Sequence, residues 1–261
     1  MSIDEHPCFS APAHFRSARV HLPVAPACNI QCNYCDRTVS DCVHSSRPGL
    51  TARIMREEEA LEHVAAFRAR EPRLRVVGIA GPGEPLYNDA SFRVLRAVGE
   101  RFPDVTLCLS TNGLLLPRVL PQLLDIGVGT LTVTINASSP QVAQRIYRGV
   151  DVDHLLAQQL LGIEQAAACG LAVKVNTVLI PGVNDGQVVD IARRAARAGA
   201  RLQNIIPLIP IGRFSAHVAP TPDQLHQLRQ LATVHLEQFY HCRQCRADAM
   251  GVPGEMPKAL P

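Results

Sequence analysis

Short runs of aliphatic and β-branched residues alternate with longer stretches of helical periodicity along most of the chain. The longer stretches predict helices, at residues 51–70, 89–102, 118–126, 152–168 and 185–198. A further helix is predicted to begin at Thr221, because this residue forms a capping-box signal with Pro222 and Gln224. The short runs predict strands, at residues 19–24, 74–80, 105–110, 130–136, 172–178 and 203–209.

This alternation indicates an α/β protein with a parallel sheet, because parallel neighbouring strands need crossover helices. A closed barrel has eight such units in about 250 residues, whereas this chain shows six. We therefore expect a partial (βα)6 TIM-like barrel over residues 19–240. Residues 1–18 and 241–261 are expected to be extensions over the barrel mouth, and the stretch from Gly251 onward to be a tail.

The composition excludes several classes of protein. With 47% hydrophobic and 19% charged residues, the chain is not intrinsically disordered. A net charge of +3 and the lack of tryptophan argue against nucleic-acid binding. No apolar run approaches the roughly 18 residues of a membrane span, and the first residues show no signal-peptide pattern. We expect a cytoplasmic protein without nucleic-acid or membrane partners.

The cysteines are the most informative residues. Nine cysteines in a reducing cytoplasm are typical of ligands or catalysts rather than disulfides. Cys28, Cys32 and Cys35 follow the first predicted strand with the spacing Cys-x3-Cys-x2-Cys. Three thiolates can bind three irons of a four-iron cubane and leave the fourth iron open to a small molecule. Structural zinc is the main alternative, although zinc favours four ligands in paired spacings. Cys169 belongs to no motif and is expected in the core.

Polar and glycine-rich segments follow the next predicted strands, at the edge where a parallel sheet binds its ligands. Residues 81–85, Gly-Pro-Gly-Glu-Pro, form either a simple turn or a loop whose backbone approaches a ligand closely. Ser110 and Asn112 lie at the end of the third strand. Asn136 and Asn176 end the fourth and fifth strands, either as strand caps or as ligand contacts.

The cysteine triplet and the Gly-Pro-Gly-Glu-Pro loop resemble those of the radical S-adenosylmethionine (SAM) superfamily. Six further motifs narrow the resemblance to the NifB family, in its form without a C-terminal carrier-like domain. These motifs are His-Pro-Cys at 6–8, His-Leu-Pro-Val-Ala-Pro at 21–26, Asp-Cys-Val at 41–43, Leu-Cys-Leu-Ser-Thr-Asn-Gly at 107–113, Val-Thr-Ile-Asn-Ala at 133–137 and His-Cys-Arg-Gln-Cys-Arg-Ala-Asp at 241–248. The resemblance extends over nearly the whole chain.

The resemblance implies a radical SAM enzyme that makes the iron–sulfur precursor of the nitrogenase iron–molybdenum cofactor. It implies that Cys28, Cys32 and Cys35 hold a 4Fe–4S cluster whose open iron binds SAM. One-electron reduction then cleaves SAM to a 5′-deoxyadenosyl radical. The resemblance also implies a set of residues that position SAM, namely Tyr34, Gly81, Gly83, Glu84, Ser110, Asn112, Asn136 and Asn176.

Two further 4Fe–4S clusters are substrates in this family, and they are fused into an eight-iron product that contains a carbide. The resemblance implies one ligand set for each substrate cluster, the first being His21, Cys42 and Cys108, and the second Cys8, Cys242 and Cys245. It further implies partners: a cluster-delivery scaffold, cofactor carrier or assembly proteins, and an electron donor such as ferredoxin.

The chain departs from the family pattern at three places. His44 and Ser45 stand where the family has Asn and Glu, which leaves proton handling near a substrate cluster open. Glu84 replaces the usual Asp, and residues 146–150 lack a Pro-Trp pair, which leaves one wall of the pocket open. Two other functions are kept as alternatives, a radical SAM enzyme acting on another small molecule and a non-catalytic iron–sulfur scaffold.

Overall fold

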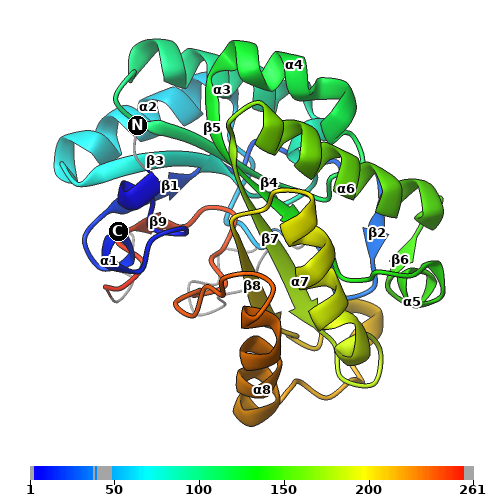
Figure 1. Ribbon diagram of the computed structural model, residues 1–261. Helices are drawn as coiled ribbons and strands as arrows, with labels where there is room; N and C mark the ends of the chain where they lie inside the picture. Colours follow the sequence, from blue (N-terminus) through cyan, green and yellow to red (C-terminus); the bar gives the residue numbers. More distant parts are fainter. Residues whose placement is uncertain (1–2, 38, 40–48, 256–261) are drawn as a thin grey trace.

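The computed structural model describes residues 3–37, 39 and 49–255. Its centre is a curled seven-stranded sheet with the order β8-β7-β5-β4-β3-β1-β9 (Figure 1). Neighbouring strands are parallel except β9, which runs antiparallel to β1. The strands are β1 (Ala18–His21), β3 (Leu74–Ile79), β4 (Thr106–Thr111), β5 (Val128–Thr134), β7 (Ala172–Leu179), β8 (Leu202–Pro207) and β9 (Met250–Gly251). The predicted partial barrel with six parallel strands is confirmed.

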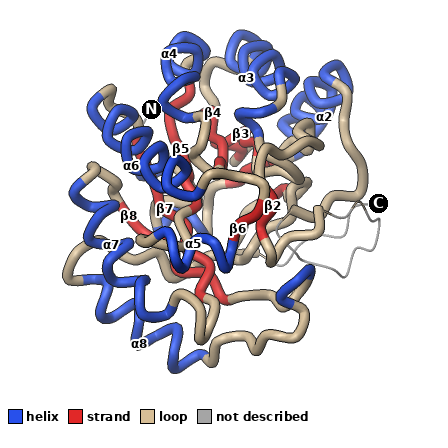
Figure 2. The backbone as a smooth tube through the Cα atoms, turned by 90° about the vertical axis from the view of Figure 1, so that its right-hand side faces the viewer, coloured by secondary structure: helices blue, strands red, loops and turns tan. Residues whose placement is uncertain are grey.

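Helices surround the outside of the curled sheet (Figure 2). The long ones are α2 (Glu57–Arg70), α3 (Asp89–Arg101), α4 (Leu116–Ile126), α6 (Val152–Ala168), α7 (Val188–Arg197) and α8 (Pro222–Thr233). The capping box of α8 is confirmed, since Thr221 and Gln224 exchange hydrogen bonds of 2.9 and 3.2 Å. α2 starts later than predicted because the backbone N–H of Met55 donates to the Pro23 carbonyl at 3.1 Å, which holds the preceding segment against the loop after β1.

Several short elements carry no periodicity that a sequence pattern can reveal. They are α1 (Ala11–His14), α5 (Pro140–Ile146), the antiparallel pair β2 (Gln31–Cys32) and β6 (Tyr147–Arg148), and the 3₁₀ turns η1 (Ile3–Glu5), η2 (Pro85–Tyr87), η3 (Asp185–Gln187) and η4 (Gly212–Phe214). The β2–β6 pair matters most for the site, because it places the second cysteine of the triplet.

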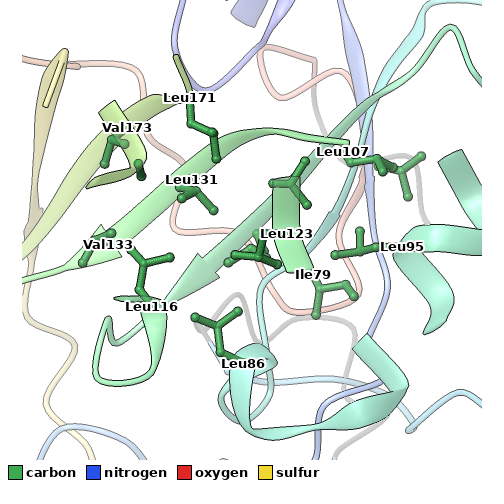
Figure 3. Close-up of a cluster of buried hydrophobic side chains, with 14 of the residues drawn as sticks. Ile79, Leu86, Leu95, Leu107, Leu116, Leu123, Leu131, Val133, Leu171 and Val173 are labelled. Carbon is green, nitrogen blue, oxygen red and sulfur yellow. The ribbon is translucent and has the colours of Figure 1, made fainter. Parts of the chain in front are cut away.

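The main hydrophobic core lies between the sheet and the helices. Leu107, Leu131 and Val173 project from neighbouring strands into one cluster with Leu116 and Leu123 of α4 (Figure 3). Because successive side chains of a strand point to opposite faces, the alternate positions face the concave interior of the barrel. That interior is strongly polar and includes Arg19, His21, Cys108, Thr130, Lys174 and Asn176.

The terminal segments close the barrel at its open side rather than lying wholly over its mouth. Phe9 packs against Leu202 and Phe239 near the amino ends of β7 and β8. The C-terminal segment forms a bridge from Gln238 to Gln203 of β8 and then reaches β1 as β9, so it spans both edges of the sheet (Figure 1). The sequence did not predict this arrangement, because the pairing of β9 with β1 involves too few residues to produce a strand pattern.

The expectation of a tail from Gly251 onward is wrong for the residues that the structure describes. Gly251 is paired with Arg19 in the sheet, and Val252 is buried. The Gly254 N–H donates to the His14 carbonyl at 2.9 Å, and Glu255 forms a 2.6 Å ion pair with Arg73. The end of the described chain is thus fastened to the barrel edge.

Candidate active site

The three cysteines of the triplet face one cavity of about 210 Å³ at the carboxyl ends of the strands. Cys28, Cys32 and Cys35 are all free thiols of intermediate burial. Cys32 is fixed by β2, which pairs it with Tyr147 of β6. The Gln31 side chain donates to the carbonyls of Cys32 and Cys35, both at 2.9 Å, and so holds the loop in a compact turn.

Asn33 anchors the cysteine loop to the segment that departs from the family pattern. Its backbone N–H donates to the Ile146 carbonyl and its Nδ2 to the Arg145 carbonyl, each at 2.8 Å. The Arg148 guanidinium donates back to Asn33 Oδ1 at 2.9 Å. Tyr147 is 4% exposed and lines the cavity. Tyr147 therefore forms the cavity wall in the segment where the sequence lacks the Pro-Trp pair.

The thiols fit a 4Fe–4S cluster in number, and all three line one cavity. Among the described residues, no three His, Cys, Asp or Glu side chains already converge on the position of one metal ion. In a cubane cluster each cysteine binds a different iron, so the three sulfur atoms need not meet at one point. The cluster needs three thiols around one cavity, and these are present. Burial raises the pKa of both Cys32 and Cys35. Bound iron would supply the positive charge that favours their thiolates.

Gly83 brings the Gly-Pro-Gly-Glu-Pro loop against the cysteine loop. Its N–H donates to the Ala25 carbonyl at 2.6 Å, and the next N–H, that of Glu84, donates to the Ala27 carbonyl at 2.8 Å. A Cβ on Gly83 would lie 2.2 Å from the Ala27 oxygen, so any side chain here would displace one loop. Gly83 lines the cavity, whereas Gly81 does not and faces Ala247 instead.

Glu84 joins this loop to the end of β4 and is 4% exposed. Its carboxylate accepts hydrogen bonds from Thr111 Oγ1 at 2.6 Å, Asn112 N at 2.7 Å and Leu86 N at 3.0 Å. Burial raises the pKa of Glu84 to about 7, and these three hydrogen bonds oppose the rise. Its side chain thus fastens two strand-end loops at the cavity wall.

Ser110, Asn112 and Asn176 line the same cavity, as predicted for the strand ends. Asn112 also donates from Nδ2 to Asn29 Oδ1 at 2.7 Å, which links β4 directly to the cysteine loop. Asn176 accepts a 3.1 Å hydrogen bond on Oδ1 from Asn204 Nδ2. Their placement fits cofactor contacts, and the assignment of each contact to SAM stays a prediction.

Asn136 lies behind the cavity rather than on its wall, and it is fully buried. Its Nδ2 donates to the Tyr34 hydroxyl at 2.7 Å, while its Oδ1 accepts from the Val178 N–H at 2.8 Å. Asn136 therefore links the cysteine loop to the end of β7 through these two hydrogen bonds, a connection called the Asn136 bracket below. A direct contact of Asn136 with SAM stays a prediction.

Two members of the first substrate-cluster set lie in one row of the sheet. His21 pairs with Gly78, and Gly78 pairs with Cys108. The third member, Cys42, lies outside the described residues. Burial lowers the pKa of His21 to about 4, so its imidazole is neutral near pH 7. Its Nδ1 lies 3.2 Å from the Arg246 carbonyl, which only accepts hydrogen bonds, and Nε2 therefore keeps its lone pair for a metal.

The second substrate-cluster set comes from opposite ends of the chain, and the fold brings its members close. Cys8 and Cys242 pack against the same small cluster around Phe9. Burial raises the pKa of Cys8 to about 11, and the nearby Cys245 contributes to that rise. Cys245 Sγ in turn accepts a 2.9 Å hydrogen bond from the Arg19 guanidinium. The assignment of either set to a cluster stays a prediction.

Sequence reasoning missed several residues of the site and misplaced one cysteine. Gln244, between the two C-terminal cysteines, lines the cavity and donates to the Pro207 carbonyl at 2.8 Å. Gln159 is 1% exposed and supports the ends of β4 and β5, but its helical position gives no signal of that role. Cys169 is exposed at the end of α6, so its expected place in the core is wrong.

Comparison with known proteins first establishes the class. Residues 22–195 match the radical SAM superfamily, which is more than half of the chain. The crystal structure of a radical SAM methyltransferase from Sphaerobacter thermophilus has a similar fold, with a TM-score of 0.57 and 21% identity over 85% of this chain and 64% of that one. The partial barrel with its cysteine loop is thus that of the radical SAM superfamily, for which a 4Fe–4S cluster and SAM are the expected cofactors.

Two curated relatives identify the particular family. The FeMo cofactor biosynthesis protein NifB of Klebsiella pneumoniae is 44% identical over 96% of this chain and 57% of its own length. NifB of Methanocaldococcus infernus is 40% identical over 96% of this chain and 86% of its own length. The chain belongs to the NifB family. It spans only 51–60% of the length of several bacterial relatives. In the described residues, no helix is long and apolar enough to cross a membrane.

Proposed function

We propose that this chain is the enzyme that joins two 4Fe–4S substrate clusters into an eight-iron, carbide-containing precursor of the nitrogenase iron–molybdenum cofactor. The inserted carbon would come from the methyl group of one SAM molecule, and a second SAM would supply the radical that removes hydrogen from it. Family membership supports a place in cofactor assembly. The chemistry itself rests on the arrangement of thiols and imidazole in this chain.

The observation that carries the proposal is the presence of two separate groups of cysteine and histidine side chains inside one barrel. Three thiols face the cavity at the strand ends. On the concave face of the sheet, His21 and Cys108 share a row, and Cys8 and Cys245 lie within electrostatic reach of each other. A radical enzyme for a small organic substrate needs only the first group, so the second group favours metal clusters as substrates.

The residues of the cavity divide the work between binding and exclusion of water. Cys28, Cys32 and Cys35 would hold the SAM-binding cluster, which supplies the electron that cleaves the SAM sulfonium. Glu84 and Asn112 fix the strand-end loops around it. The apolar side chains that line the cavity restrict water near a reactive radical, and they include Ile30, Tyr147, Val178 and Leu208.

The proposed partners follow from the same chemistry. Two preformed clusters must be delivered, so we propose a scaffold protein as donor and a carrier or assembly protein as acceptor of the product. The reductive cleavage of SAM needs an external one-electron donor of the ferredoxin class. These assignments rest on family membership and on the requirement for substrate delivery.

Anaerobic reconstitution with iron and sulfide, followed by dithionite and SAM, tests the proposal. We expect about 12 irons per chain, four for each of three clusters. Both S-adenosylhomocysteine and 5′-deoxyadenosine should form, the first from methyl transfer and the second from hydrogen abstraction. The Cys28→Ala variant should form no 5′-deoxyadenosine, because the SAM-binding cluster is lost.

Other outcomes separate the alternative functions. Iron that saturates near four per chain, together with 5′-deoxyadenosine, indicates a radical SAM enzyme for another small molecule. Full iron loading without either SAM product indicates a non-catalytic scaffold. Zinc in place of iron at the cysteine loop contradicts all radical functions.

A further inference from the structure

Two positive side chains are buried in the barrel interior without a carboxylate partner among the described residues. Arg19 of β1 is 6% exposed and Lys174 of β7 is 5% exposed. Other arginines form ion pairs near the surface, as Arg68 does with Asp104 at 2.6 Å. An unpaired buried charge is strongly unfavourable for folding. The presence of two such charges in one interior therefore indicates that an anionic group binds there.

The contacts of Arg19 are incomplete. One of its terminal nitrogens donates to the Gly251 carbonyl at 2.6 Å, and the other donates to Cys245 Sγ at 2.9 Å. Its Nε is buried and has no hydrogen-bond partner in the described chain. The guanidinium thus uses neutral acceptors, and one of these is a thiol of the second substrate-cluster set.

Lys174 is similarly held by neutral groups. Its Nζ donates to the Cys8 carbonyl at 3.1 Å and lies 5.2 Å from the Phe9 ring and 5.6 Å from the Phe239 ring. The ammonium acts electrostatically on both Cys8 and Cys108, which belong to different substrate-cluster sets. Lys174 therefore lies near one predicted ligand of each substrate cluster.

His6 provides an independent sign of a missing ligand in the same place. It is 2% exposed, and its Nδ1 accepts a hydrogen bond from the Cys8 N–H at 3.1 Å. Its Nε2 is buried without a hydrogen-bond partner in the described chain. Lys174 and His21 both lie close enough to act on the His6 imidazole. This buried polar atom lies next to residues of both predicted ligand sets, which indicates that the interior is built for a further polar group.

We infer that Arg19 and Lys174 form an anion-binding pair that neutralises the two substrate clusters as they are brought together. With a one-electron-reduced core of charge +1, a 4Fe–4S cluster on three thiolates has a net charge of about −2, and one on two thiolates and a neutral imidazole about −1, so two such clusters repel each other at close approach. Fixed cations between them offset that repulsion in a low-dielectric interior. The inference rests on the proposed function, because it assigns a charge to the substrates named there. It adds a charge-compensating role for two residues that ligate no iron.

The test compares neutral and charge-conserving variants. Lys174→Met and Arg19→Met remove the charges, whereas Lys174→Arg and Arg19→Lys keep them. Arg68→Met removes a surface charge and serves as the control. For each protein we would measure the melting temperature before reconstitution, the iron and sulfide per chain afterwards, and the midpoint potentials of the clusters by EPR-monitored titration.

Removal of the charge should not reduce the stability of the protein without clusters, but it should reduce cluster binding after reconstitution. Without clusters, Lys174→Met should melt at the wild-type temperature or about 2–4 °C above it, because an uncompensated buried charge is removed. After reconstitution, the same variant should lose more than half of its substrate-cluster iron, and the remaining clusters should have more negative potentials. Lys174→Arg should restore both quantities, and Arg68→Met should change neither.

Two results would overturn the inference. Equal iron content and equal potentials in Lys174→Met and wild type would show that the charge does not act on the clusters. An equal loss of iron in Lys174→Arg and Lys174→Met would show that shape, not charge, is what matters. If the wild type itself holds only the SAM-binding cluster, then the proposed function fails, and this result is distinguishable because it does not depend on any variant.

Discussion

His21 and Cys108 stand on either side of Gly78 in one row of three neighbouring parallel strands. A Cβ built on Gly78 would lie 3.5 Å from Cδ2 of His21 and 3.6 Å from Cβ of Cys108. The row lies on the concave face, opposite the main core. The missing side chain therefore leaves room between an imidazole and a thiol, where a metal cluster would be bound.

A methyl group at position 78 should reduce binding of the substrate cluster without reducing the stability of the fold. The Gly78→Ala methyl group meets its neighbours at 3.4–3.6 Å, which is ordinary contact, so the variant should fold with unchanged or slightly higher stability. It should nevertheless lose iron in anaerobic reconstitution, because the methyl group occupies the space between the two ligands. Gly129→Ala, at a glycine of β5 whose nearest contact is a Thr106 methyl group, is the control and should keep its iron. Full iron content in Gly78→Ala would contradict the cluster position.

Gly83→Ala should damage the cysteine loop. The added Cβ would lie 2.2 Å from the Ala27 carbonyl oxygen, so one of the two loops must shift. We expect a loss of about 2 kcal/mol or more in the free energy of unfolding and a several-fold loss of SAM-cluster iron. Gly186→Ala, where a Cβ has nothing within 4 Å, should match the wild type in both measurements. A Gly83→Ala protein with normal iron would show that the close approach is dispensable.

Glu84 should make stability depend on pH in a defined window. Its folded pKa of about 7 is above the ordinary value of 4.5, so the folded state holds the proton more tightly than the unfolded state. The contribution is therefore fully present below pH 4.5 and is lost as the pH rises through about 7. The total change is roughly 3 kcal/mol. Urea unfolding should show the stability of wild type relative to Glu84→Gln falling as the pH rises across this range, because buried histidines such as His21 titrate in both proteins. A constant difference between the two proteins would contradict the assignment.

Tyr34→Phe should weaken the bracket between the cysteine loop and β7. The change removes the oxygen that accepts the 2.7 Å hydrogen bond from Asn136 Nδ2 and leaves a fully buried amide unpaired. We expect a loss of about 1–3 kcal/mol in the free energy of unfolding. Tyr87→Phe, at an exposed tyrosine of η2, is the matched control and should change stability little. Equal stability of the two variants would rule out the bracket.

The large elements of the fold could be predicted because their signals are local. The 152–168 helix agrees with α6 at both ends, since Asp151 caps its first turn and apolar positions recur along it. The β2–β6 pair could not be predicted, because it has two residues in each strand and forms between segments more than a hundred positions apart. Its stability comes from tertiary contacts such as those of Asn33, which a pattern of periodicity does not contain.

The site shows the same division. The positions of Cys28, Cys32 and Cys35 follow from spacing alone, because a short loop after a strand must bring them to one edge. The buried charges Arg19 and Lys174 did leave a signal, since each interrupts the apolar pattern of a strand at an inward position. The supporting role of Asn136 left none, because strand caps and ligand contacts use the same residue type at the same place.

The central claim is that the cysteine loop leaves one iron of its cluster open for SAM. The most direct test is electron–nuclear double resonance on the reduced, reconstituted protein with SAM labelled by ¹⁷O in the carboxylate and ¹⁵N in the amino group. The account predicts hyperfine coupling of both labels to the cluster, and its loss in Cys28→Ala. An unchanged EPR spectrum on addition of SAM, with no coupling to either label, would contradict it.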